Sequence, residues 1–246
     1  MAGGPIEPEE DCGLAKRIVA ECSCKGSGLT TSSLICTCNG GKLVVKDYSK
    51  KSLKWLVTLP YIPVYRYIYS PEGRLRNELA WYRRLRGAYP VPRIITYCME
   101  ERPLLVREFI DGEPASDSVD ENAWRELGFG LARLHFAVGA VLGDPNPGNF
   151  IYRGGRVWLV DFEQADDYTP YKAAWDLLVL AATTIALASP LKWRFVEMAL
   201  SSYREAAGDR WSEVLDALGD VRLKLLNPLL VSPLHAIRFY RLARSL

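Results

Sequence analysis

One stretch, residues 142–164, constrains the fold of this chain more than any other part of the sequence. Within it, residues 150–152 and 157–160 are short runs rich in β-forming side chains. They flank Gly154 and Gly155, a pair that readily adopts the positive φ angles of a tight hairpin turn. The stretch therefore predicts a β-hairpin whose two flanking loops lie at the same end of the ribbon.

Three oxygen-bearing side chains stand in these two loops. Asp144 and Asn149 precede the hairpin and Asp161 follows it. Oxygen ligands of this kind suit Mg²⁺, which binds one or two carboxylates together with phosphate oxygens and water, and a remaining carboxylate can accept a proton. The alternative is that residues 144–149 form only a polar turn, because Asp, Pro, Asn and Gly each favour turns.

The segments G-D-P-N-P-G-N-F (residues 143–150) and V-D-F-E (residues 160–163) resemble the catalytic and metal-binding segments of the protein-kinase-like superfamily. The similarity is to its compact branches, which include RIO and KEOPS-type kinases, lipopolysaccharide-core kinases and aminoglycoside phosphotransferases. This resemblance implies an α+β, two-lobed protein-kinase-like fold, with an antiparallel N-lobe sheet, one N-lobe helix and a mainly helical C-lobe. It divides the chain into a flexible tail (1–15), an N-lobe (16–110) and a C-lobe (111–246).

The resemblance also implies roles for individual residues. Asp144 would be the catalytic base or hydroxyl-orienting group, and Asn149 and Asp161 would hold Mg²⁺ beside the phosphates of ATP. Lys46 follows three apolar residues of a predicted strand, where an unpaired ammonium group is costly, so it requires a partner. In the family this lysine contacts the phosphates and pairs with a helix glutamate. Glu78 is the candidate for this helix glutamate. The alternative is that Glu78 is a solvated surface residue.

Two further segments would bind the nucleotide. Gly26, Ser27 and Gly28 resemble the first part of a kinase glycine-rich loop, whose backbone N–H groups approach the phosphates, although the third glycine is absent. A hairpin tip that binds nothing would look the same. Glu108 and Ile110 resemble the linker between the lobes and would offer backbone hydrogen bonds to adenine.

Several positions depart from the family pattern. Arg107 stands where the family usually has an apolar residue at the back of the nucleotide pocket, so it is expected to turn toward Glu113 or the surface. Leu142 and Gly143 replace the usual histidine and arginine before the catalytic aspartate, and Asn146 replaces the lysine of Ser/Thr protein kinases. The segment after the second loop is short and contains no A-P-E sequence, which argues against switching by phosphorylation.

The sequence leaves the phosphate acceptor open between a protein and a small-molecule hydroxyl. The chain is predicted to be an atypical Ser/Thr protein kinase or a sugar or lipid kinase. The alternative is a pseudokinase that binds nucleotide or acts as a scaffold. The irregular glycine loop and Leu142-Gly143 favour this alternative, whereas the retained Lys46 and Asp144 oppose it.

Composition limits the remaining possibilities. The chain has 246 residues, of which 49% are hydrophobic and 24% charged, as expected for a globular protein with a sizeable core. Its net charge of +2 gives no strong nucleic-acid signal. The N-terminal residues do not resemble a signal peptide, so the expected location is cytoplasmic.

Two aromatic or apolar segments raise the question of membrane contact. The run at residues 173–191 is interrupted by Asp176 and stopped by Pro190, which predicts a buried helix rather than a transmembrane segment. The long connection at residues 49–69 is rich in aromatic side chains. It is expected to pack against the lobes, with contact to a membrane surface or a partner as the alternative, and the oligomeric state stays open.

Four of the six cysteines form two C-x-C pairs, the first at the end of a predicted strand at residues 17–24. If this strand pairs with the next one in antiparallel fashion, Cys22 faces Cys38 and Cys24 faces Cys36 on one face of the sheet. The four thiols could then bind zinc, form disulfides of the kind found inside hyperthermophile cells, or stay reduced as small apolar residues. The remaining cysteines, Cys12 and Cys98, favour none of these states.

Overall fold

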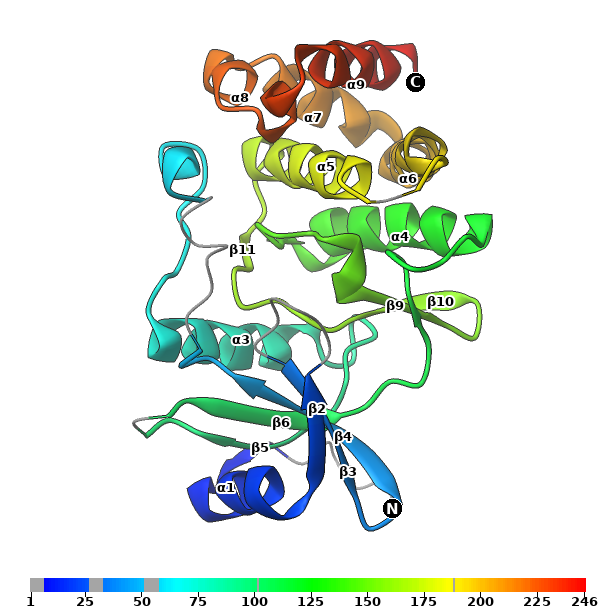
Figure 1. The fold of residues 1–246 in the computed structure, drawn as a ribbon. Helices are drawn as coiled ribbons and strands as arrows, with labels where there is room; N and C mark the ends of the chain where they lie inside the picture. Colours follow the sequence, from blue (N-terminus) through cyan, green and yellow to red (C-terminus); the bar gives the residue numbers. More distant parts are fainter. Residues whose placement is uncertain (1–6, 27–32, 51–57, 101, 188) are drawn as a thin grey trace.

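The computed structural model describes residues 7–26, 33–50, 58–100, 102–187 and 189–246. Two lobes are stacked along the long axis of the molecule, one built around a twisted sheet and the other around a group of helices (Figure 1). The N-terminal half of the chain forms the sheet lobe and the C-terminal half forms the helical lobe. The predicted two-lobed α+β architecture is confirmed.

The N-lobe sheet has six strands: β1 (Glu9–Glu10), β2 (Ser23–Gly26), β3 (Ser33–Cys38), β4 (Gly41–Asp47), β5 (Ile94–Cys98) and β6 (Leu104–Glu108). Their order across the sheet is β1-β5-β6-β4-β3-β2. Neighbouring strands are antiparallel, except that β1 runs parallel to β5. The turn between β3 and β4 is formed by Asn39 and Gly40, with φ angles of 43° and 84°, as expected for an Asn-Gly hairpin.

Side chains of β4 and β6 alternate between the two faces of the sheet. Val45 and Val106 are paired and belong to a small apolar core on the outer face, beneath the helix α1 (Cys12–Glu21). Lys46 and Leu105 are also paired, and they lie on the inner face, which is turned toward the helical lobe (Figure 1). The sheet therefore separates a small outer apolar core from an inner face on which apolar and charged residues are both buried.

The N-terminal part of the lobe differs from the sequence prediction. The expected tail at residues 1–15 is wrong from Glu9 onward, because β1 pairs with β5 and α1 follows it. The expected strand at residues 17–24 is also wrong, since residues up to Glu21 are helical and the strand begins at Ser23. The lobe consequently has a second helix in addition to the one predicted.

Local chemistry explains the helix α1. The side chain of Asp11 caps it by accepting the Leu14 N–H at 2.8 Å, which satisfies one of the free donors of the first turn. Ala15 and Ile18 are buried against the sheet. Because they lie three residues apart, they fall on one face of a helix.

All six cysteines form disulfides. Cys22 is bonded to Cys38 and Cys24 to Cys36, which are the facing pairs expected from antiparallel strands. The zinc and reduced-thiol alternatives are therefore wrong. A third bond, which the sequence did not indicate, joins Cys12 at the start of α1 to Cys98 at the end of β5.

The inner face of the sheet is covered by the helix α3 (Pro71–Leu85). Ser70 caps this helix by accepting the Gly73 N–H at 3.2 Å, and Pro71 occupies its first turn, as the sequence predicts. Glu78 is completely buried on this helix. The alternative that Glu78 is a solvated surface residue is therefore wrong.

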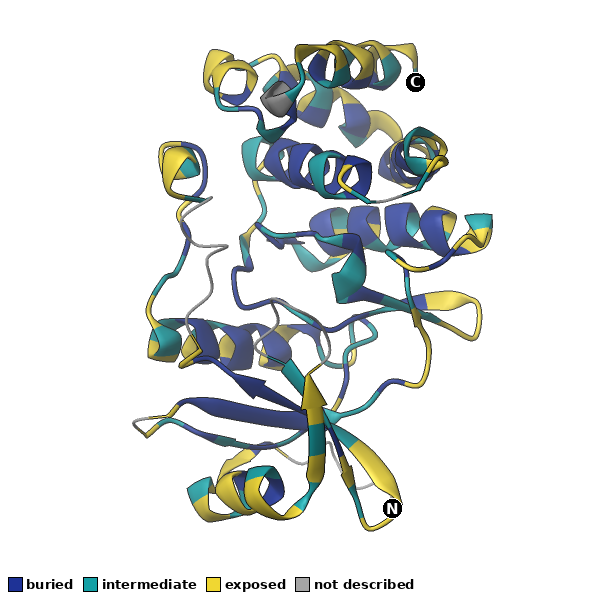
Figure 2. Cartoon of the chain, in the orientation of Figure 1, coloured by how far each residue is buried: buried dark blue, intermediate teal, exposed yellow. Residues whose placement is uncertain are grey.

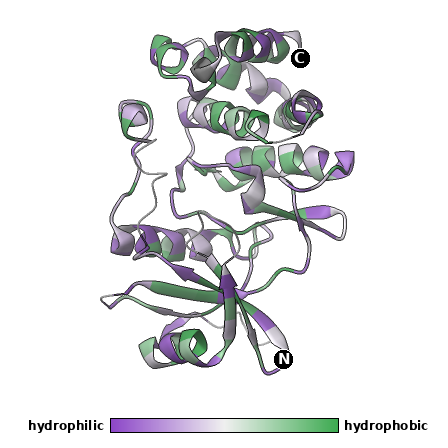
Figure 3. Cartoon of the chain, viewed as in Figure 1, coloured by the Kyte–Doolittle hydropathy of each residue, from purple (hydrophilic) through white to green (hydrophobic). Residues whose placement is uncertain are grey.

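The C-lobe contains the helices α4 (Glu121–Arg133), α5 (Pro170–Ile185), α6 (Lys192–Ala207), α7 (Trp211–Leu218), α8 (Val221–Leu225) and α9 (Pro233–Ser245). A π-helical turn, Leu134–Val138, extends α4. Figures 2 and 3 show that α4 and α5 are largely buried and that α5 is rich in hydrophobic residues. Helices α4 and α6 pack closely, with Trp124 stacked on Phe195 at 4.5 Å between ring centroids. Across the described ranges, none of the helices is long and apolar enough to span a bilayer.

Candidate active site

The predicted hairpin is present between the two lobes. Strands β9 (Phe150–Arg153) and β10 (Arg156–Leu159) are antiparallel, and Gly154 and Gly155 form the turn with φ angles of 59° and 76°. The loop before β9 ends in a short 3₁₀ turn, Pro147–Asn149. Hairpin and turn together fix the backbone on which the polar side chains stand.

Asn149 connects the two loops. Its Nδ2 donates to the carbonyl oxygen of Asp144 at 3.1 Å, and its own carbonyl oxygen accepts the Val160 N–H at 3.0 Å. The loop that carries Asp144 is therefore bonded to the residue directly before Asp161. Because its Nδ2 is committed to the first bond, the amide oxygen of Asn149 is the atom that can serve as a ligand.

Asp176 holds the backbone of the first loop. This carboxylate on α5 is completely buried and accepts the N–H groups of Leu142 at 2.7 Å and Gly143 at 2.8 Å. It also lies 3.1 Å from the Nε2 of the buried His135, whose Nδ1 is bonded to the hydroxyl of Tyr203 at 2.8 Å. Buried carboxylates require such partners. His135 is consequently part of the core.

Lys46 is the centre of a buried charge cluster, which we call the interlobe site and define as Lys46, Glu78, Asp161 and Glu163. The ammonium Nζ lies 2.6 Å from Glu78, 2.7 Å from Asp161 and 3.0 Å from Glu163. The predicted pairing of Lys46 with Glu78 is therefore present. The bond to Asp161 brings the N-lobe lysine to the end of the C-lobe hairpin.

Burial and charge act in opposite directions on this cluster. Burial alone would lower the pKa of Lys46, but the carboxylates of Asp161, Glu163 and Glu78 outweigh it and hold that pKa well above its ordinary value. Burial raises the pKa of Glu78, with a smaller opposing effect from Lys46. The hydroxyl of Tyr48 donates a short hydrogen bond to the same glutamate. The lysine is therefore firmly charged.

Glu163 is a member of the site that the sequence prediction missed. Besides Lys46, it contacts the Arg74 guanidinium at 3.3 Å, and Arg74 also donates to the carbonyl oxygen of Tyr48 at 2.6 Å. The backbone carbonyl of Glu163 accepts the Asn77 side chain at 3.0 Å. The available signal was the glutamate itself in V-D-F-E, because a charged residue beside a metal-binding aspartate requires a partner when it is buried.

The aromatic connection before α3 reaches across to both catalytic loops. Tyr65 donates to the Gln164 carbonyl oxygen at 2.6 Å, and Tyr67 donates to the Gly143 carbonyl oxygen at 3.1 Å. Gly143 has a φ of 71°, and a Cβ there would collide with the Tyr65 ring. The absence of the usual arginine at position 143 thus makes room for Tyr65. The expected packing of this connection is confirmed for residues 58–69.

The predicted nucleotide-binding residues are only partly described. Gly26 is the last residue of β2, whereas Ser27 and Gly28 lie outside the described residues. Glu108 ends β6, and its N–H donates to the Arg93 carbonyl oxygen at 2.9 Å. Ile110, two residues later, is buried. The role of these residues in binding a nucleotide stays a prediction.

Arg107 does not turn toward Glu113 or the surface, so that expectation is wrong. Its side chain is 7% exposed. It follows Leu105 by two residues on β6, which places it on the same face of the sheet as Lys46. Burial lowers the pKa of Arg107, and the nearby carboxylates of Glu78 and Asp161 only partly offset this effect. The guanidinium therefore belongs to the inner face.

The donors at the end of the hairpin suit Mg²⁺. Asn149 and Asp161 offer amide and carboxylate oxygens, which are the hard ligands this ion prefers. Carboxylate oxygens of Glu78, Asp161 and Glu163 also lie within 4.8 Å of one another, but Lys46 contacts all three. The role of Asn149 and Asp161 as the ligands of Mg²⁺ therefore stays a prediction.

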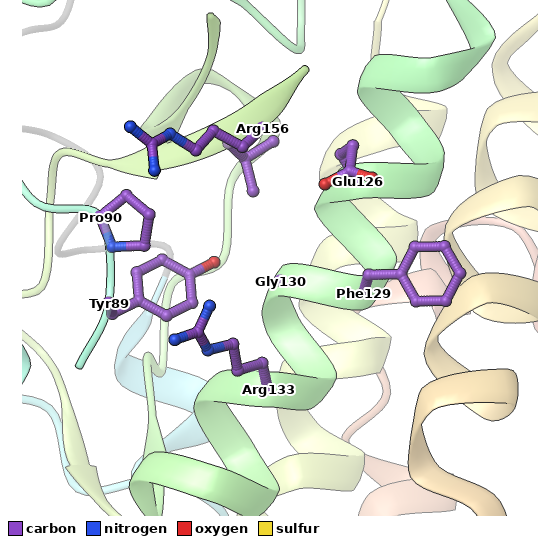
Figure 4. Close-up of a pocket in the computed structure, with 8 residues that line it drawn as sticks. Tyr89, Pro90, Glu126, Phe129, Gly130, Arg133 and Arg156 are labelled. Carbon is purple, nitrogen blue, oxygen red and sulfur yellow. The ribbon is translucent and has the colours of Figure 1, made fainter. Parts of the chain in front are cut away.

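A separate pocket lies between the chain after α3 and the helix α4. Its volume is about 210 Å³, below the range usual for ligand sites and small for a nucleoside triphosphate. Figure 4 shows Tyr89 in this pocket with Arg133 and Arg156 on either side. The Tyr89 hydroxyl is buried without a hydrogen-bond partner. This pocket is not part of the interlobe site.

Comparison with known proteins shows which family the chain is related to. The model of the phosphotransferase enzyme family matches residues 33–141. The KEOPS complex subunit Bud32 of Pyrococcus abyssi is 30% identical over 197 residues, which cover 74% of this chain and 83% of the relative. A probable serine/threonine-protein kinase, the BUD32 homolog of Archaeoglobus fulgidus, is 35% identical over 77 residues, covering 31% of this chain and 37% of the relative.

A solved structure, aminoglycoside-3'-phosphotransferase of type VIII, shares the fold with a TM-score of 0.55. It is 18% identical, and the match covers 84% of this chain and 93% of that chain. At this identity the likeness supports the fold alone. The relationship to Bud32, in contrast, extends over most of both sequences. The chain is a kinase and belongs to the Bud32 family within the protein-kinase-like superfamily.

Proposed function

We propose that this kinase transfers the γ-phosphoryl group of MgATP to a hydroxyl acceptor. The observation that carries this proposal is the contact of 2.7 Å between Lys46 of the N-lobe and Asp161 of the C-lobe. It lies beside the loop that presents Asp144, which Asn149 bonds at 3.1 Å. A cation from one lobe and oxygen ligands from the other are the groups that phosphoryl transfer requires.

Each residue has a separate role in this proposal. Lys46 binds the phosphates and balances their charge, and Glu78 holds the lysine in place. Asn149 and Asp161 would hold Mg²⁺, which neutralises charge on the phosphate oxygens when bound. Asp144 orients the acceptor hydroxyl for in-line attack and accepts its proton. Most of the rate acceleration then comes from positioning and electrostatics.

A protein serine or threonine hydroxyl is the first acceptor to test. The Archaeoglobus relative is described as a probable serine/threonine-protein kinase, and the Pyrococcus relative as a subunit of the KEOPS complex. By analogy, the acceptor or a binding partner would be another protein of such a complex. Sugar and lipid hydroxyls are the second class, since the shared fold also occurs in an aminoglycoside phosphotransferase.

The test is transfer of label from [γ-³²P]ATP to protein, sugar and lipid pools in the presence of Mg²⁺. Label is expected in one acceptor class or in the chain itself, and Asp144→Asn should remove nearly all of it. Omission of Mg²⁺ with a chelator should do the same. Absence of label from every pool, including autophosphorylation, would contradict the proposal.

A pseudokinase is the second candidate, and one contact favours it. Glu163 adds a third carboxylate to Lys46, at 3.0 Å, and this carboxylate competes with phosphate oxygens for the ammonium group. Nucleotide binding without turnover in both the native chain and Asp144→Asn would support this candidate. Turnover by the native chain alone supports the kinase.

A further inference from the structure

Arg107 occupies an unusual position for an arginine. It pairs with Val44 of β4 and Ile94 of β5 in the middle of the sheet. Its side chain shares the inner face with Lys46, and it directly precedes Glu108, the first residue of the linker proposed to bind the base. An arginine there faces the same space as the nucleotide proposed for the interlobe site.

Among the described residues, the guanidinium has no ion-pair partner. Its Nε is also buried without a hydrogen-bond partner. Glu78 is near, but its Oε2 is already bonded to Lys46 and Tyr48, and its Oε1 has no partner either. Burying an unpaired cation costs free energy, so a ligand that supplies the missing acceptors recovers part of this cost.

The chemistry of guanidinium selects the ligand. Its five N–H groups only donate, and two of them can bind a pair of acceptors side by side. The N7 and O6 atoms of guanine form such a pair, whereas adenine presents a donating amino group at the 6-position. A guanine whose N1–H donates to the carbonyl oxygen of Glu108 would turn this edge toward the preceding residue.

We propose that Arg107 makes the interlobe site prefer a 6-oxopurine nucleotide, such as GTP, over ATP. This inference rests on the proposed nucleotide site and changes only the identity of the base. The apolar residue usual at this position in the family contributes neither donors nor acceptors. Its replacement by arginine therefore adds a requirement that adenine does not satisfy.

The test measures equilibrium binding of ATP, GTP and ITP to the full chain by calorimetry in the presence of Mg²⁺. GTP and ITP should bind with similar affinity, each roughly tenfold tighter than ATP, because both carry the N7 and O6 acceptors. Arg107→Met should remove this preference. Arg93→Met is the matched control, since Arg93 is exposed on the adjoining segment and contacts Glu108 only through its backbone.

Three results would overturn the inference: tighter binding of ATP by the native chain, a preference that survives in Arg107→Met, or an equal loss of affinity for all three nucleotides. The last would make Arg107 a positioning residue for Glu78. If Arg107→Met does not fold, Arg107→Gln replaces it, because the amide presents one donor and one acceptor, which match the N7 and amino group of adenine rather than the two acceptors of guanine. This variant should also lose the preference.

Measurements of phosphoryl transfer distinguish a failure of the base preference from a failure of the kinase mechanism. A native chain that prefers GTP but transfers phosphate from neither nucleotide contradicts the kinase mechanism and leaves the base preference intact. A chain that transfers phosphate from ATP without preferring GTP contradicts the base preference alone.

Discussion

The two faces of the N-lobe sheet are stabilised by different kinds of interaction. The outer face carries a small apolar core beneath α1, and all three disulfides of the chain lie on it. The inner face carries Lys46 and Arg107 and joins the large core that continues into the C-lobe. The same strands supply both faces, because adjacent residues such as Val45 and Lys46 point in opposite directions.

This difference follows from size and function. A core as small as the outer one buries little apolar surface, and covalent links are a common way to stabilise such a unit. The inner face packs against a second lobe. Its charged residues can therefore be buried in ion pairs with residues of that lobe, while the large apolar core continues around them. The outer face therefore contributes stability, and the inner face contributes the site.

The largest expected effect on phosphoryl transfer is on the inner face. Lys46→Met should reduce phosphoryl transfer at least about 100-fold, because the phosphates lose their cation. It should also lower the free energy of unfolding by about 3 kcal/mol, since three carboxylates then lie together without the ammonium group that they share. Initial rates with labelled nucleotide and chemical denaturation measure the two effects.

The control for this change is Lys42→Met. Lys42 lies on the same strand and is exposed, with its ammonium group over the Phe109 ring. Its replacement should leave transfer and stability nearly unchanged. Equal losses of transfer rate and stability from both substitutions would mean that replacing any lysine on β4 has these effects. The inner site would then not differ from the rest of the strand.

The next effect is on the outer face. Cys12 and Cys98 are 86 residues apart, and a bond that closes a loop of this length stabilises by about 4 to 5 kcal/mol in the chain-entropy account. Replacing both by alanine should therefore lower the melting temperature strongly. The folded variant should nevertheless keep the transfer rate of the unmodified chain. A large loss of transfer in folded protein would show that the two faces are not independent.

The hairpin disulfides provide the comparison for this change. Cys22–Cys38 and Cys24–Cys36 close the same hairpin, with separations of 16 and 12 residues. Replacing Cys24 and Cys36 leaves the other bond to hold the hairpin closed, so the loss should be below about 1 kcal/mol. A loss equal to that of the Cys12–Cys98 change would contradict the loop-length argument.

Asp47 gives a smaller, pH-dependent effect. Burial would raise its pKa, but hydrogen bonds from Ser49 and Arg102 outweigh this and lower it. A lowered pKa adds stability above the unfolded value of about 4, and this stability is lost as the pH falls through the folded value. Asp47→Asn should therefore cost about 1 kcal/mol at neutral pH, and the difference from native protein should shrink below about pH 4. A constant difference down to pH 2 would contradict this.

Features of the site with local signals could be predicted from the sequence. The hairpin at residues 150–159 has a glycine pair between two β-forming runs, and α3 has a capping serine followed by proline. The hairpin and the helix start need only a few neighbouring residues. The need of Lys46 for a partner followed from the cost of an unpaired buried charge, and the family resemblance indicated Glu78, 32 residues away.

Features that depend on distant residues could not be predicted. The contacts of Tyr65 and Tyr67 with the catalytic loops span 99 and 76 residues. The third carboxylate on Lys46 comes from Glu163, far along the chain. The direction of Arg107 depends on its register with β4, which a single sequence does not give, and expecting it to avoid burial was therefore wrong.

The smallest expected effect concerns two tyrosines of the large core. The hydroxyl of Tyr89 is buried without a partner (Figure 4), whereas that of Tyr65 donates to Gln164 at 2.6 Å. Tyr89→Phe removes an unsatisfied polar group and should change stability by less than about 0.5 kcal/mol, with stabilisation the expected direction. Tyr65→Phe leaves a carbonyl group without its donor and should cost about 1 kcal/mol. Denaturant midpoints of both variants measure the difference, and a greater loss from Tyr89→Phe would mean that water or a bound molecule satisfies this hydroxyl in solution.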